Sequence, residues 1–86
     1  MPVFEVLLSK AARKQLSTLP AFIHNKLIEE ISNLSLKPRP TGCKKLKGYK
    51  NSYRIRLGNY RIIYEIEDKV LRILVIAIGH RKDIYE

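Results

Sequence analysis

The segment Ser52–Leu57 alternates between polar and apolar side chains, and this period of two constrains the fold more than any other feature of the chain. Gly58-Asn59 follows directly. Glycine in a two-residue loop supplies the positive φ that a tight hairpin turn requires. Tyr60–Ile66 is β-prone and can form the return strand. The pattern therefore predicts a β-hairpin.

A two-residue turn also sets the register of this hairpin, with Leu57 opposite Tyr60 and Arg56 opposite Arg61. Because side chains alternate across a sheet, one face can bury against helices. That face holds Tyr53, Ile55, Leu57, Tyr60, Ile62 and Tyr64. The other face holds Arg54, Arg56 and Arg61. A solvated polar face is ordinary on an antiparallel sheet, but three guanidinium groups beside Glu65 also suit phosphate, which arginine binds bidentately.

Helical periodicity precedes the hairpin. Ser9 can cap a first helix. The apolar positions of that helix are Ala11, Ala12, Leu16 and Leu19. Pro20 suits the first turn of a second helix. Apolar residues recur along that helix at Ile23, Leu27, Ile31 and Leu34. Ile28 widens this apolar stripe, and the prolines of segment 37–42 end the helix in a loop.

Two further segments, 3–8 and 70–78, favour β-strands. The expected order of elements is β-α-α-β-β-β. A helical hairpin packed on one face of a mostly antiparallel sheet is a two-layer α+β fold. With 86 residues, the chain is expected to form a single domain over residues 1–86.

The connection between the second and third strands of the sheet is predicted at residues 67–69. A two-residue turn at Asp68-Lys69 would place Glu65 opposite Arg72 and Arg61 opposite Ile76. The last strand would then end at Gly79, near Arg61.

The charge composition of the chain indicates the class of its binding partner. The chain has 17 basic and 8 acidic residues, a net charge of +9, which favours nucleic acid over an acidic protein and over a membrane. The longest apolar run, Ile73–Ile78, is far short of a membrane span. No signal peptide is recognised, and the single cysteine, Cys43, excludes an intrachain disulfide. We therefore expect a cytoplasmic protein without a membrane partner.

The sequence lacks the motifs of most enzyme classes. Two histidines, one cysteine and scattered carboxylates make a metal site improbable, and no phosphate-binding glycine loop is present, so neither a metal nor a cofactor is expected. Arginine, tyrosine and His80 remain. These residue types suit cleavage of RNA by its own 2′-hydroxyl, where the protein must move protons and stabilise negative charge on phosphorus. DNA lacks that hydroxyl.

The segment 52–66 (SYRIRLGNYRIIYEI), with 78–85 (IGHRKDIY) and Leu46-Lys47-Gly48, resembles the RelE branch of the RelE/ParE toxins. The resemblance covers nearly the whole chain, including the helical hairpin. It implies a ribosome-dependent messenger-RNA endonuclease that is silenced by an acidic antitoxin protein. The site that it implies falls on Arg54, Arg56, Arg61, Arg81 and Tyr85.

The resemblance leaves the general base open. The best-known RelE pattern has lysines where this chain has Arg54 and Arg56, and arginine is effectively never deprotonated. Tyr85 is then expected to be the base, or His80 shares the task, whereas the plainer interpretations are an aromatic that covers the sheet edge and a loop histidine. Arg54 and Arg56 are expected to bind RNA. Lys44, Lys45, Lys47 and Lys50 are expected to help attract mRNA and ribosomal RNA in the ribosomal A site.

Two other functions stay open. A ParE-like gyrase poison would share the fold but bind a protein. A non-enzymatic module that binds RNA or the antitoxin would result from loss of a working base.

Overall fold

The computed structural model describes residues 3–48 and 50–80. In chain order the elements are β1 (Glu5–Leu8), α1 (Lys10–Ser17), α2 (Ala21–Asn33), β2 (Lys44–Lys45), β3 (Ser52–Leu57), β4 (Tyr60–Glu67), a 3-10 turn (Asp68–Val70) and β5 (Arg72–His80). The predicted α+β fold is confirmed, and β2 is added to the expected order of elements. Neither of these helices is long and apolar enough to cross a membrane.

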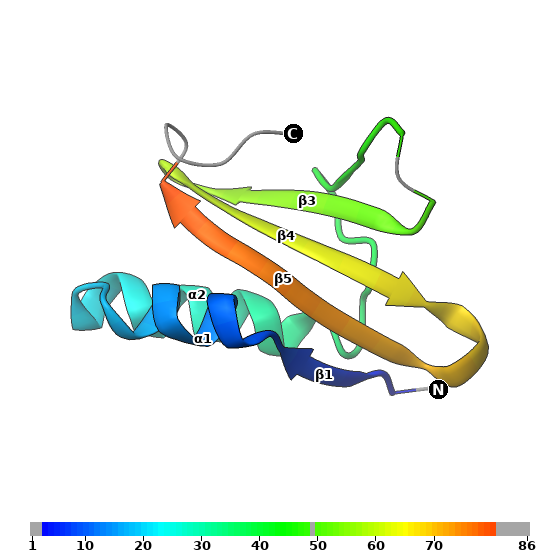
Figure 1. The fold of residues 1–86 in the computed structure, drawn as a ribbon, viewed down its shortest axis with the longest axis horizontal. Helices are drawn as coiled ribbons and strands as arrows, with labels where there is room; N and C mark the ends of the chain where they lie inside the picture. The colour runs from blue at the N-terminus through cyan, green and yellow to red at the C-terminus, as the bar shows by residue number, and fades with distance from the viewer. Residues whose placement is uncertain (1–2, 49, 81–86) are drawn as a thin grey trace.

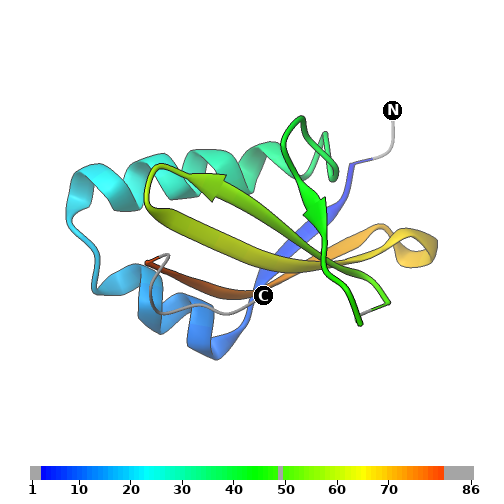
Figure 2. The same cartoon turned by 90° about the horizontal axis from the view of Figure 1, so that it is seen from above.

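The strands form one mixed sheet in the order β1-β5-β4-β3-β2. β1 pairs with β5 in parallel, and the other neighbours are antiparallel. Both helices lie against the same side of the sheet, as Figure 1 shows from the side and Figure 2 from above. The opposite side of the sheet is called the open face below.

Ser9 begins the helical hairpin as predicted. Its Oγ accepts a hydrogen bond from the backbone N–H of Ala12 at 3.0 Å and satisfies a donor that the first helical turn leaves without a partner. Two details of the expected helices are wrong. Pro20 is the N-cap of α2 and precedes its first turn. Ile28 is 36% exposed and lies outside the buried stripe.

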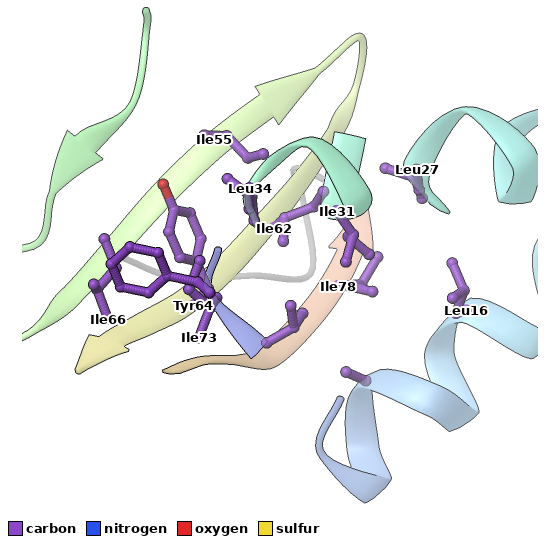
Figure 3. Close-up of a cluster of buried hydrophobic side chains, with 13 residues drawn as sticks. Leu16, Leu27, Ile31, Leu34, Ile55, Ile62, Tyr64, Ile66, Ile73 and Ile78 are labelled. Atoms are coloured by element: carbon purple, nitrogen blue, oxygen red, sulfur yellow. The ribbon is translucent and has the colours of Figure 1, made fainter. Parts of the chain in front are cut away.

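The core lies between the helices and the sheet (Figure 3). Its largest fully buried side chains are Tyr64, Leu27, Leu34, Ile62, Ile66, Ile73, Ile78 and Val75. The predicted apolar face of the β3–β4 hairpin faces this core. The hydroxyl of Tyr64 donates a hydrogen bond to the Pro38 carbonyl at 2.8 Å, which ties the loop after α2 to the sheet. Burial raises the pKa of Tyr64 well above its usual range.

The predicted turn between β4 and β5 is wrong. Residues 68–70 form a 3-10 turn, and Leu71 closes it with a left-handed φ of 52°. A register shift follows between Ile63 and Tyr64, so that Glu65 pairs with Leu74 and Arg61 pairs with Gly79. The segment lacks the glycine that a two-residue turn prefers, and the longer turn moves the start of β5 to Arg72 and its end to His80.

Helix α1 covers the edge of β5 that β1 leaves open. The pairing of β1 ends at Leu8 and Val75. Beyond that point the Oγ of Ser9 donates to the Ile76 carbonyl at 2.7 Å, and the side-chain oxygen of Gln15 accepts from the Ile78 N–H at 2.7 Å. The side chains of the α1 N-cap and of α1 itself thus bond the strand edge that β1 leaves open.

Candidate functional site

The hairpin register gathers arginines on the open face. Arg56 pairs with Arg61 and Arg54 with Ile63, as the two-residue turn predicts, and Gly58 has the expected positive φ of 60°. Residues that face each other across a sheet project to the same side. Arg54, Arg56 and Arg61 therefore share the side away from the helices, and we call this set the arginine face.

The three arginines differ in burial. Arg54 is only 6% exposed, Arg61 is half-buried and Arg56 is exposed. The Nε atoms of Arg54 and Arg61 are both buried. A guanidinium group loses hydration when it is buried, at substantial cost. An ordinary solvated face would not impose that cost, so the positions of Arg54 and Arg61 are specific features of the fold.

β2 extends the positive charge of the arginine face. Lys44 pairs with Arg54 and so projects to the same side, whereas Lys45 pairs with Tyr53 and projects to the other. Lys47 and Lys50 are exposed in the following segment. These four lysines are called the lysine segment. A hollow of about 270 Å³ opens between Lys44, Lys45, Leu46 and Lys47.

His80 lies on the helix side of the sheet. It pairs with Tyr60, and the two rings meet edge to face with centroids 5.6 Å apart. A hollow of about 350 Å³ beside them is also lined by Gln15 and Thr18 of the helical hairpin. Although Gly79 pairs with Arg61 on β4, the next residue projects to the opposite side. The fold therefore separates the imidazole from the arginine face.

The structure thus brings together Arg54, Arg56, Arg61 and Lys44 but not His80. Arg81 and Tyr85 lie outside the described residues. Within residues 3–48 and 50–80, no three His, Cys, Asp or Glu side chains are grouped so that they could hold a metal ion.

Arg39 is a structural residue that sequence reasoning missed. Its guanidinium lies 5.1 Å from the Tyr53 ring centroid, donates to the Tyr53 hydroxyl at 3.2 Å and forms an ion pair with Asp68 at 2.8 Å. The hydrogen bond from Arg39 lowers the pKa of the Asp68 carboxyl, and the same bond raises the pKa of Arg39. The three residues are far apart in the sequence, so no local pattern indicates the contact.

The described residues form a small α+β domain with two helices on one side of the sheet and arginines on the other. The chain matches the family described as "ParE toxin of type II toxin-antitoxin system, parDE" over residues 6–85, and it belongs to this family within the RelE/ParE superfamily. It is thus the toxin component of a type II toxin-antitoxin system.

Named relatives carry RelE-type names. The chain is 41% identical over 86 residues to Toxin RelE3 of Methanocaldococcus jannaschii, with 95% of this chain and 96% of that protein covered. It is 29% identical to Toxin RelG of Mycobacterium tuberculosis, with 95% of each chain covered. A chain in the crystal structure of the archaeal RelE-RelB complex from Pyrococcus horikoshii superimposes with a TM-score of 0.83 at 29% identity, covering 95% of this chain and 99% of that one.

Proposed function

We propose that this toxin is a ribosome-dependent mRNA endonuclease that cleaves RNA through the substrate's own 2′-hydroxyl, without a metal ion. The observation that carries the proposal is the register of β3 and β4, which holds Arg56 beside Arg61 and places the buried Arg54 on the same face. Preorganised cations of this kind stabilise the charge that develops on phosphorus in the transition state.

The proposed role of each arginine follows from how exposed its side chain is. We assign Arg61, which is half-buried on this face, to the scissile phosphate, and we assign Arg81 to the same phosphate. Arg56 is exposed and holds the neighbouring phosphates of the strand. Arg54 is the most buried of the set and adds a fixed positive charge beneath them. This arrangement supports binding of one RNA strand across the open face.

Tyr85 is the proposed general base. Arginine is not deprotonated in proteins, so the arginine face cannot remove the 2′-proton. The His80 ring meets Tyr60 edge to face on the other side of the sheet, which favours tyrosine over histidine as the base. A free phenol titrates near pH ~10. A guanidinium group beside a phenol favours the phenolate and so lowers the pKa of that phenol.

The lysine segment suits the second partner. Lys44, Lys45, Lys47 and Lys50 are all exposed at the β2 edge of the sheet. We assign them to phosphates of ribosomal RNA in the A site, where salt weakens such contacts. This assignment places the toxin in the cytoplasm, where ribosomes work.

The antitoxin is the third proposed partner. Solved relatives of this fold include the RelE-RelB complexes from Pyrococcus horikoshii and Methanococcus jannaschii. With a net charge of +9, this chain suits an acidic antitoxin that covers the arginine face and silences it.

The test is in vitro translation of a defined message, followed by primer extension. Toxin and ribosomes together should cut the message, and neither should cut it alone. A message with a single 2′-deoxynucleotide at the mapped cleavage position is the matched control, because it lacks only the nucleophile. Cleavage of that message at the parental rate would contradict the proposed mechanism.

A gyrase poison is the second candidate, because the matching family description names ParE. Brief induction of the toxin in a bacterial host separates the two functions. The endonuclease yields cut message, whereas the gyrase poison yields broken DNA. A non-enzymatic module that binds RNA or the antitoxin yields neither.

A further inference from the structure

An apolar groove of about 320 Å³ lies on the helix side of the β3–β4 hairpin tip. Figure 2 shows that tip beside the first turns of α2. The groove is lined by Phe22, Ile23 and Lys26 of α2 and by Leu57, Asn59 and Tyr60 of the hairpin. None of these lining residues is acidic.

Phe22 has the most unusual environment in the groove. It is 71% exposed, more than any other large apolar side chain in the described part of the chain. The ammonium group of Lys26 lies 5.4 Å from the centroid of its ring. An open aromatic ring beside a cation is the arrangement with which proteins hold an unpaired base and its phosphate.

We propose that this groove binds one nucleobase of the RNA strand that crosses the arginine face. The inference rests on the proposed function in taking RNA as the ligand. The base stacks on Phe22, Lys26 attracts the adjoining phosphate, and the Asn59 amide faces the edge of the base. A volume at the low end of the ligand-pocket range of about 300–1,000 Å³ suits a single base.

The hairpin links the groove to the arginine face. The pair Leu57 and Tyr60 lines the groove, and the adjacent pair Arg56 and Arg61 projects from the other side of the same two strands. Leu57 and Tyr60 are the last pair of the hairpin, and only the two-residue turn follows them. A strand of RNA that bends around this tip therefore places a phosphate on the arginines and a neighbouring base in the groove.

A single fluorophore tests the stacking. The chain contains no tryptophan, so Phe22→Trp introduces one indole into the groove. We expect hexaadenylate at low salt to quench its emission. Leu36→Trp is the matched control, because Leu36 is 64% exposed but does not line the groove. The tryptophan emission of Leu36→Trp should not change when RNA is added. The anisotropy of labelled hexaadenylate shows in parallel that the RNA has bound.

Affinity measurements distinguish the contribution of the stacked base to RNA binding from the contribution of the phosphates. Phe22→Ala should weaken hexaadenylate binding about tenfold, as expected for the loss of one stacked base. The salt dependence should stay unchanged, because stacking releases no counterions. An abasic strand with the same number of phosphates should bind the parent and Phe22→Ala equally. Leu36→Ala should behave as the parent.

The outcomes are decisive. Unchanged affinity in Phe22→Ala, equal quenching by the abasic strand, or no binding of hexaadenylate by the parent would each overturn the nucleobase groove. The first two results would leave an apolar surface that fits a protein partner better. The test is independent of catalysis: cleavage of message without quenching refutes the groove alone, and quenching without cleavage refutes the endonuclease alone.

Discussion

The side-chain oxygen of Gln15 on α1 accepts a hydrogen bond of 2.7 Å from the backbone N–H of Ile78 on β5. Ile78 is fully buried, so water cannot replace this acceptor. The bond joins residues 63 positions apart and fixes the helix against the end of the strand that pairs with the arginine-bearing β4. A polar side chain of the helical hairpin therefore helps to hold the candidate site in place.

We expect Gln15→Ala to lower the free energy of unfolding by about 1–3 kcal/mol, because it leaves a buried N–H without an acceptor. Urea denaturation measures this loss. Ser17→Ala is the control on the same helix, since its exposed hydroxyl bonds only the Lys14 carbonyl. The control should stay within about 0.5 kcal/mol of the parent. Equal stability of Gln15→Ala and the parent would show that the bond contributes nothing.

The ion pair between Arg39 and Asp68 predicts a pH-dependent contribution to stability. The pKa of Asp68 is lowered in the folded state, so the pair stabilises the fold above the unfolded pKa of about 3.9. The contribution is lost as pH falls through the lower folded pKa. Asp68→Asn should therefore unfold more easily than the parent at neutral pH, and the difference should vanish in acid. A difference that persists in acid would contradict this account.

Arg61→Ala should slow cleavage strongly while the domain stays folded. One preorganised charge is worth about 3 kcal/mol in the transition state, or some hundredfold in rate. Removing Arg61 also relieves repulsion from Arg56 opposite. Single-turnover cleavage on ribosomes gives the rate, and circular dichroism reports the fold.

Arg72→Ala is the matched control for Arg61→Ala, because Arg72 begins β5 and pairs with Glu5 at 3.3 Å. It should cut at the parental rate. If Arg61→Ala unfolds the domain, the arginine face is structural and the central inference fails.

Tyr85→Phe should slow cleavage severely, because it removes only the hydroxyl that the mechanism uses as a base. His80→Gln should cleave nearly as well as the parent, since the imidazole meets Tyr60 edge to face, away from the arginine face. The pair of variants is compared by single-turnover rates. The reverse ranking would make His80 the base.

Cleavage should not depend on a metal at the scissile phosphate. Ribosomes need magnesium themselves, so the test replaces a non-bridging oxygen of that phosphate by sulfur in an intact ribosome assay. Thiophilic metal ions should not restore the rate of the sulfur-substituted message. Restoration by such an ion would establish a metal contact and refute this prediction.

The β3–β4 hairpin was predictable in register because one local feature, the Gly58-Asn59 turn, determines every pair along it. The β4–β5 turn could not be predicted in the same way. Its residue with a left-handed φ is Leu71, and leucine, unlike glycine, does not indicate a turn. β2 was missed because two lysines have no alternation to detect. The parallel pairing of β1 with β5 depends on contacts between distant segments.

The candidate site was predictable to a similar degree. The shared face of Arg54, Arg56 and Arg61 follows from the register. The burial of Arg54 and the placement of His80 against Tyr60 do not, because both depend on how neighbouring strands twist and what covers them. The end of the last strand was expected near Arg61, and Gly79 does pair with Arg61, but the side chain of the next residue, His80, lies on the other side of the sheet.

The parallel pairing of β1 with β5 has a consequence during protein synthesis. Glu5 leaves the ribosome early, but its partner Arg72 is added 67 residues later. Such distant contacts form slowly, and a sheet cannot close before its last strand has emerged. β5 also pairs with β4, the strand that bears Arg61. In a nascent chain that lacks β5, the arginine face therefore has no neighbouring strand on that side of β4. The proposed site can therefore assemble only after β5 has been synthesised.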